Sequence, residues 1–203
     1  MVFVVVVLLQ FAVLTSYCLG MGRNEEPTAV VVDAETGEPI EGAVAIAIWR
    51  KHSVTETAWF EGGKMVVVRA EEAVSDKEGK IYIDDFWDWH LFENRYPRLT
   101  IYKPGYVCWD QQVVYIAKYK SVKRNDFNKE NRIVRMKKWW DDFSFIEHGG
   151  FVSSVTGGSD TLKAPKQLFR KAFDYETKYE ISERTVRDNK RMEMGKRKRD
   201  KSL

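Results

Sequence analysis

One histidine and one glutamate stand at a spacing that some zinc hydrolases use to hold their metal. His90 and Glu93 spell this H-x-x-E pattern. A zinc site needs at least one further ligand and a bound water on a preformed scaffold, and the other histidines, His52 and His148, lie in unrelated segments. We therefore predict no metal site, and a metal-dependent hydrolase is the least favoured function.

The remaining acidic, nucleophilic and glycine-rich residues form no catalytic pattern. The acidic pairs Asp84/Asp85 and Asp141/Asp142 lack the spacing that would collect the six to eight oxygen ligands of calcium. The sequence contains no G-x-S-x-G motif and no glycine-rich nucleotide loop opening a helix. The sequence thus predicts a non-enzymatic protein without a cofactor.

The cysteines exclude a disulfide framework, because only two occur in 203 residues. Cys108 is surrounded by Tyr106, Val107 and Trp109, and free cysteine is among the most buried residue types. We expect Cys108 to be a buried small side chain, with a free reactive thiol as the alternative.

Aromatic residues form two clusters, in the segments FWDWHLFENRY and KKWWDDFSF. Large aromatic side chains are usually buried, so their first interpretation is packing at one end of the core. They also bind sugar faces or protein partners, because they bury much area at little cost in entropy. The candidate ligand or partner surface consists of Trp87, Trp89, Phe92, Trp139 and Trp140.

The first 20 residues carry no charge and resemble an export signal in length and apolar character. Residues 1–20 are therefore interpreted as a signal peptide or, alternatively, as a retained membrane anchor, since about 20 apolar residues span a bilayer. Cys18 near its end is a candidate lipidation site, although Tyr17 before it is bulky for that signal. We expect an exported protein of the periplasm or cell envelope.

The basic residues concentrate at the C-terminus. From residue 187 to residue 203 there are eight Lys or Arg against three acidic residues, a net charge of +5, whereas the whole chain carries +3. Residues 1–186 therefore lack the excess of positive charge that is typical of nucleic-acid-binding proteins. We interpret residues 189–203 as a basic disordered tail, and association with anionic lipid through this tail and the N-terminus is the sharper alternative.

Short β-type segments alternate with turn signals between the N-terminal block and residue 138. This spacing is typical of an all-β sandwich rather than an α/β fold, because no crossover helices separate the strands. The turn SDKEG at 75–79 suggests a hairpin between its flanking strands. The seven predicted strands lie at 28–33, 43–49, 64–70, 80–84, 98–103, 106–116 around a bulge, and 131–138.

The segment after residue 138 differs in character. Residues 139–163 are rich in Gly, Ser and Thr and indicate a linker or long loop. Residues 164–188 form one predicted amphipathic helix, since Leu168, Ala172, Tyr175 and Tyr179 recur at helical spacing.

Three turn segments resemble a known family. The segments are VVVDAETGEPIEGA at 30–43, SDKEGKIYI at 75–83 and IYKPGY at 101–106. Together they make residues 27–138 similar to the carboxypeptidase regulatory-like domain. The resemblance implies a seven-stranded, Ig-like, transthyretin-like β-sandwich that is usually non-catalytic and accessory to exported proteins. Ser75 replaces the usual threonine, and the aromatic insertion 86–96 departs from the pattern.

The first hypothesis for function is a non-enzymatic binding or structural module of the cell envelope whose partner is an unknown envelope protein or glycan. The second is a carbohydrate-binding or adhesion protein that uses Trp87, Trp89, Trp139 and Trp140. Both place ligand contacts on loops or on aromatic rings rather than at a catalytic centre.

Overall fold

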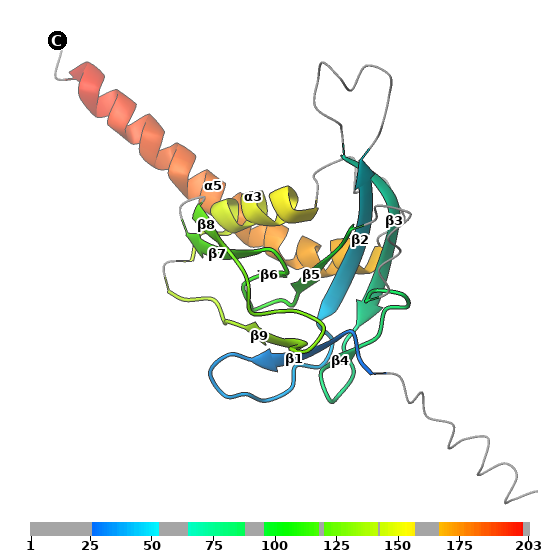
Figure 1. Cartoon of the computed structure of the whole chain (residues 1–203). Coiled ribbons are helices and arrows are strands. Elements are labelled where there is room, and N and C mark those ends of the chain that lie inside the picture. Colours follow the sequence, from blue (N-terminus) through cyan, green and yellow to red (C-terminus); the bar gives the residue numbers. More distant parts are fainter. Residues whose placement is uncertain are drawn as a thin grey trace, which may run out of the picture.

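The described residues fold into two stacked β-sheets, a further two-stranded sheet formed by residues 113–117 and 120–123, and one layer of helices (Figure 1). The computed structural model describes residues 26–52, 65–87, 96–117, 120–141, 143–156 and 167–200. Its strands are β1 (Ala29–Asp33), β2 (Val44–His52), β3 (Met65–Val74), β4 (Lys80–Ile81), β5 (Tyr96–Tyr102), β6 (Trp109–Asp110), β7 (Val113–Ala117), β8 (Lys120–Lys123) and β9 (Ile133–Met136). Its helices are α3 (Phe145–Thr156) and α5 (Gln167–Asp200).

The first sheet has the order β4-β1-β9. Strand β1 pairs antiparallel with β4 and parallel with β9, and this pairing places Val31 opposite Val134. The alternating burial along β1 follows from the period of two residues in a strand, which turns Ala29 and Val31 inward. The first sheet therefore presents one apolar face to the rest of the protein.

The second sheet, which we call the central sheet, has the order β3-β2-β5-β6 and is covered on both faces. Along β2, Ala45, Ala47 and Trp49 pack toward the first sheet. Val44, Ile46 and Ile48 occupy the opposite face and pack with residues of α3 and α5. The continuous apolar character of β2 is that of a strand covered on both faces.

Glycine corners lie where the chain passes between the first sheet and the central sheet. Gly37, Gly42 and Gly79 all have positive φ angles, which glycine adopts without steric cost. Ser75, between two of these corners, accepts the amide hydrogen of Ala43 and donates its hydroxyl to the carbonyl of Ile40. The serine hydroxyl thus adds two hydrogen bonds to those that the Ser75 backbone forms with Gly42 and Ala43.

Asp33 organises the turn that follows β1. Its carboxylate accepts the backbone amides of Glu35 and Thr36, and it also contacts Lys138 and Tyr106. These two amides, with the smaller contributions of Lys138 and Tyr106, hold the pKa of Asp33 well below its ordinary value. The aspartate of the turn motif is therefore structural, because its carboxylate is committed to the chain itself.

Several predicted strands exist but pair differently from the prediction. The hairpin expected across residues 75–79 is wrong, because β3 pairs with β2 in the central sheet whereas β4 pairs with β1 in the first sheet. The segment 106–116 divides into β6 and β7, which belong to different sheets, and the prediction omitted β8. Apart from the omission of β8, these errors concern long-range partners rather than local strand character.

The helical layer is larger than predicted. Residues 145–156 of the expected linker form α3, and α5 continues through Asp200, so residues 189–200 are helical rather than disordered. Helices and strands contribute similar numbers of residues to the part of the chain that the structure describes. The strand-rich arrangement of face-to-face sheets is confirmed at this coarser level. Within the described residues, neither helix has the apolar length needed to cross a membrane.

The corner at Gly79 provides a test of this packing. A Cβ atom there would lie 2.3 Å from the carbonyl oxygen of Val31, in addition to the strain of a φ of +74°. We expect Gly79→Ala to lower the free energy of unfolding by about 3 kcal/mol in urea titrations.

Gly37→Ala is the matched control, because Gly37 has a φ of +75° but no neighbouring atom within 4 Å of the added Cβ. Its expected loss is only about 1 kcal/mol, the strain of the backbone alone. Equal losses in the two variants would contradict the close approach of Gly79 to β1.

Candidate functional site

One group of buried polar side chains lies on the helix-facing side of the central sheet and comprises Thr100, Asp110, His148 and Glu176. Along β5, Leu99 and Ile101 pack toward the first sheet. The alternation of a strand therefore turns Arg98, Thr100 and Tyr102 toward the helical layer. Two polar clusters form on this side, one around Glu176 and the other around Asp110.

The Glu176 cluster joins three elements through one carboxylate. Glu176 of α5 is 1% exposed and His148 of α3 is fully buried. His148 Nδ1 lies 2.5 Å from one carboxylate oxygen of Glu176, and the hydroxyl of Tyr102 on β5 donates to the other oxygen at 2.8 Å. A buried carboxylate requires such donors, because it has lost its hydration.

The hydrogen bonds identify the form of the histidine. The ring atom Nε2 of His148 accepts the backbone amide hydrogen of Cys108 at 2.9 Å. The ring proton therefore resides on Nδ1, which donates it to Glu176. Burial, together with the negative charge of Glu176, raises the pKa of Tyr102 far above its ordinary value, so this phenol remains a donor.

Cys108, His148 and Glu176 supply the residue types of a cysteine nucleophile with its base and orienting acid. The geometry does not activate the thiol, because Nε2 of His148 accepts the amide of Cys108 rather than the S–H group. Sγ contacts the carbonyl of Trp109, and the residue is 3% exposed. Burial raises the thiol pKa well above its ordinary value. The predicted burial of Cys108 is confirmed.

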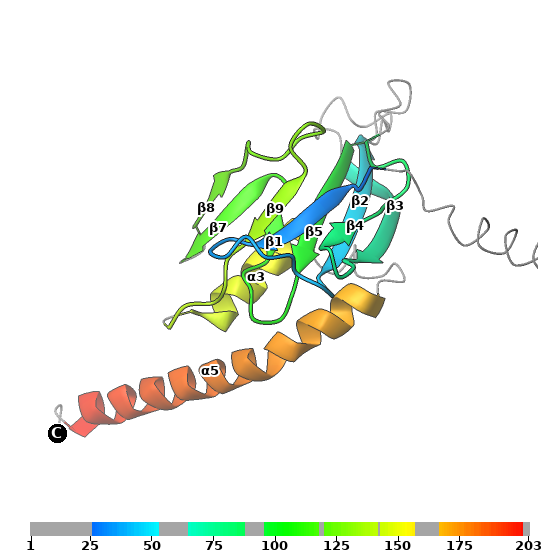
Figure 2. The same cartoon turned by 90° about the horizontal axis from the view of Figure 1, so that it is seen from below.

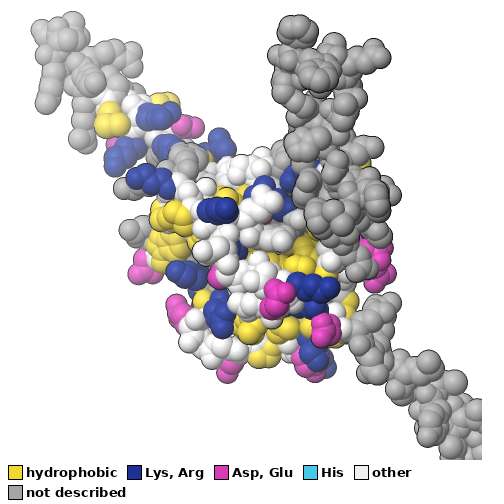
Figure 3. Space-filling model, in the orientation of Figure 1, with side chains coloured by type: hydrophobic (Ala, Val, Ile, Leu, Met, Phe, Trp, Pro, Cys, Tyr) yellow, Lys and Arg dark blue, Asp and Glu magenta, His cyan; other side chains and the backbone are white. Residues whose placement is uncertain are grey.

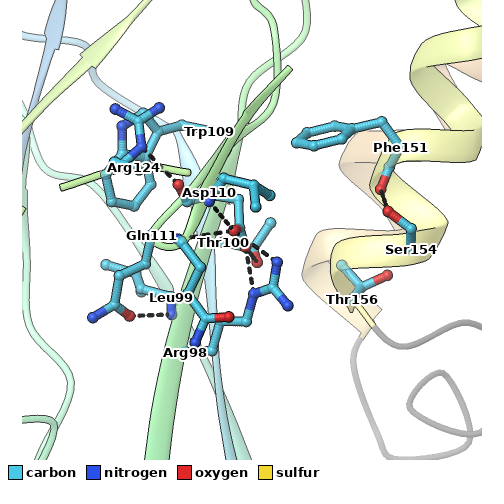
Figure 4. A network of polar contacts seen from close by, with 12 residues as sticks. Arg98, Leu99, Thr100, Trp109, Asp110, Gln111, Arg124, Phe151, Ser154 and Thr156 are labelled. Carbon is cyan, nitrogen blue, oxygen red and sulfur yellow. Dashed lines mark hydrogen bonds and ion pairs between the residues drawn. The ribbon is translucent and has the colours of Figure 1, made fainter. Parts of the chain in front are cut away.

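The Asp110 cluster ties the edge of the central sheet together (Figure 4). Asp110 is fully buried and accepts two parallel hydrogen bonds from Arg98, both at 2.8 Å, and one from Thr100. The same carboxylate accepts the backbone amides of Gln112 and Val113 where the chain passes from β6 to β7. Among the described residues, its oxygens therefore accept hydrogen bonds only from groups around the turn at which the chain leaves the central sheet.

Local caps and a small residue position α3 against α5. The hydroxyl of Ser144 accepts the amide of Glu147, as an N-cap residue does. Glu183 of α5 accepts the Ser144 hydroxyl and the amide of Ile146, so α5 itself satisfies the start of α3. Gly149 permits close packing, because a Cβ atom there would lie 3.2 Å from the carboxylate of Glu180.

The described members of the predicted aromatic surface lie on different faces of the central sheet. Trp87 is half-buried, donates its indole hydrogen to the carbonyl of Thr28 and packs against the inter-sheet core. Trp139 donates to the carbonyl of Tyr106 and packs against the helical layer. Trp140 is 41% exposed and stacks over Tyr115. Trp89 and Phe92 lie outside the described residues.

The two tryptophan segments therefore do not form one surface. Trp87 has rings of Phe86 and Phe127 and the guanidinium of Arg132 as neighbours, so its role is mainly in packing. Trp140 retains an accessible ring at the helical end of the body.

An open cavity of about 540 Å³ lies beside Trp87. Its polar wall includes the exposed carboxylates of Asp84 and Asp85, and Arg132 at its edge pairs with Glu26 at 2.7 Å. Such a cavity can hold a small polar molecule. No group of three His, Cys, Asp or Glu side chains suited to a metal ion occurs in the part of the chain that the structure describes.

Comparisons with known proteins return no match to a family model, a curated protein or a solved structure. Cys18, His90 and Glu93, the candidates for lipidation and metal binding, lie outside the described residues. The resemblance of the turn segments to a known family therefore stays a prediction.

The sequence patterns did not reveal the Glu176 cluster. His148 lies within the glycine-rich segment that predicted a linker, and Glu176 falls on the predicted amphipathic helix. The available signal was the position of Glu176, which shares a helix face with Phe169 and Ala172 at steps of four and three residues. An acidic residue within an apolar stripe indicates a buried partner.

We expect Glu176→Ala to destabilise the protein by about 3 kcal/mol, because it leaves the donors of His148 and Tyr102 buried without an acceptor. Tyr102→Phe removes one hydrogen bond to the carboxylate and costs about 1.5 kcal/mol. Urea unfolding measures both losses. Glu193→Ala, at an exposed position of the same helix, is the control, and a loss as large as that of Glu176→Ala would refute the special role of the cluster.

We also expect the Cys108 thiol to be protected in the folded protein. In a Cys18→Ser background, Ellman's reagent at pH 8 should modify the native chain at least about 1000-fold more slowly than the chain in urea, because the thiol is buried and protonated. Glu176→Ala should accelerate the reaction by destabilising the helical layer. Rapid labelling of the native chain would contradict the burial of Cys108.

Proposed function

We propose that this chain is a non-enzymatic binding or structural module of the cell envelope. Its scaffold is a seven-stranded, transthyretin-like sandwich similar to carboxypeptidase regulatory-like domains. The positions of the motif residues support this proposal. Asp33 and Ser75 form turn hydrogen bonds, and Gly37, Gly42 and Gly79 take positive φ angles, so the motif serves the scaffold rather than a ligand.

The main support for the proposal is that the carboxylates of both buried clusters form their hydrogen bonds within the protein. The carboxylates of Glu176 and Asp110 are bonded to donors of the protein itself. The Cys108 thiol is protonated and inaccessible. A catalytic centre instead presents perturbed titratable groups to a cleft. These clusters are organised to join layers of the fold.

The helical end of the body is the proposed binding region. The exposed ring of Trp140 lies there, supported by Tyr115 and Phe143. Aromatic side chains of this kind anchor protein partners at low entropic cost. In this proposal the apolar residues 1–20 direct the chain to the envelope, by cleavage, by lipidation at Cys18 or by retention as an anchor.

Intact-mass spectrometry of the protein from the membrane and periplasmic fractions of its native cells tests the location. We expect a mass lacking about 20 N-terminal residues, or a shortened chain with a lipid on Cys18, or the full-length chain in the membrane fraction. A Cys18→Ser variant separates the lipidated form from the others. The full 23.7 kDa chain in the cytosolic fraction alone would overturn the proposal.

A further inference from the structure

Helix α5 continues well past its last contact with the body. It contains 34 residues, which corresponds to about 51 Å. Glu183 accepts hydrogen bonds from Ser144 and Ile146 next to α3, whereas residues 184–194 are all exposed. We call the segment 185–200 the overhang, and Figures 1 and 2 show it extending away from the sheets.

One face of α5 runs continuously from the docked half into the overhang. Phe169, Glu176 and Glu183 face the body at steps of seven residues, and Tyr179 packs on Phe145 between them. The same helical spacing continues this face beyond Glu183. The continuation consists of Arg187, Lys190, Arg191, Met194, Arg197 and Lys198, and we call these positions the basic stripe.

The basic stripe carries a concentrated positive charge. Its described members are exposed, and Met194 at its centre is 51% exposed. Arg187 at its start pairs with Glu183 at 3.3 Å, so the charge free for a partner begins at Lys190. The acidic residues Asp188 and Glu193 fall on other sides of the helix by their spacing. Figure 3 shows Lys and Arg side chains gathered on the projecting helix. The face of α5 that packs on the rest of the protein up to Glu183 therefore continues as a basic face in the overhang.

We propose that the basic stripe docks an acidic polypeptide segment of a partner protein, which extends the interface that α5 already makes with the body. This inference rests on the proposed function, because export removes nucleic acid as a competing polyanion. Complementary charge supplies the attraction and the orientation of the partner. Met194 supplies an adaptable apolar contact at the centre of the interface.

The direction of the basic stripe favours a polypeptide over a flat bilayer. The stripe lies in line with Phe169, Glu176 and Glu183, which face the body. A planar membrane on that side of the helix would have to pass through the body, whereas a single helix or strand fits beside the overhang. A second copy of α5 is disfavoured, since both overhangs are basic and like charges repel.

Fluorescence anisotropy with the purified full chain tests this docking. The probe is a fluorescein-labelled helical peptide of about three heptads, built from Glu, Ala and Leu with the Glu and Leu on one face. At about 0.1 M salt we expect saturable binding. Lys190→Glu with Arg191→Glu should weaken the binding at least about tenfold, and Met194→Ala should weaken it about threefold.

The matched control is Lys196→Glu with Arg199→Glu, which changes the net charge by the same amount at positions off the basic stripe. Its expected effect is below about threefold, since screening limits the contribution of charges outside the interface. Equal losses in both double variants, absence of peptide binding, or tighter binding to phosphatidylglycerol vesicles or to single-stranded DNA would each overturn the proposal. The binding assay uses purified protein, whereas the location is tested by intact-mass spectrometry of cell fractions, so the two proposals can fail separately.

Discussion

The carboxylate of Glu176 is the constraint on which the arrangement of the layers depends. A charge removed from water must recover its hydrogen bonds within the protein. The donors are a histidine on α3 and a tyrosine on the central sheet. His148 in turn accepts the backbone amide of Cys108, so both helices and the sheet must be in place together before this charge is satisfied.

The same hydrogen bonds leave the Cys108 thiol without a base to activate it. His148 is occupied on both ring nitrogens, so it cannot take a proton from the Cys108 thiol. The second carboxylate, Asp110, is similarly occupied by Arg98, Thr100 and two backbone amides. The buried polar groups of these clusters thus hold the layers of the fold together. The exposed Trp140 and the basic overhang of α5 are the features that we propose for recognition.

Local patterns predicted the strands well and their partners poorly. Alternation in β1, the apolar run of β2 and the glycine corners are properties of a few neighbouring residues. The pairing of β4 with β1 instead of β3 joins segments about 50 residues apart, and its choice depends on which faces are buried together. The glycine-rich α3 has weak intrinsic propensity. Caps from Ser144 and Glu183 and close packing at Gly149 stabilise it.

By itself the sequence determined the strand-rich body, the corners at Gly37, Gly42 and Gly79, the burial of Cys108 and the basic character of the C-terminus, because each depends on residue type and short-range spacing. Only the tertiary structure decided that His148 meets Glu176 across 28 residues, that the tryptophan segments occupy different faces of the central sheet, and that the docked face of α5 continues as a basic stripe. The reason is that burial of a polar side chain is favourable only beside its partner, and a linear pattern does not contain the distance between two side chains.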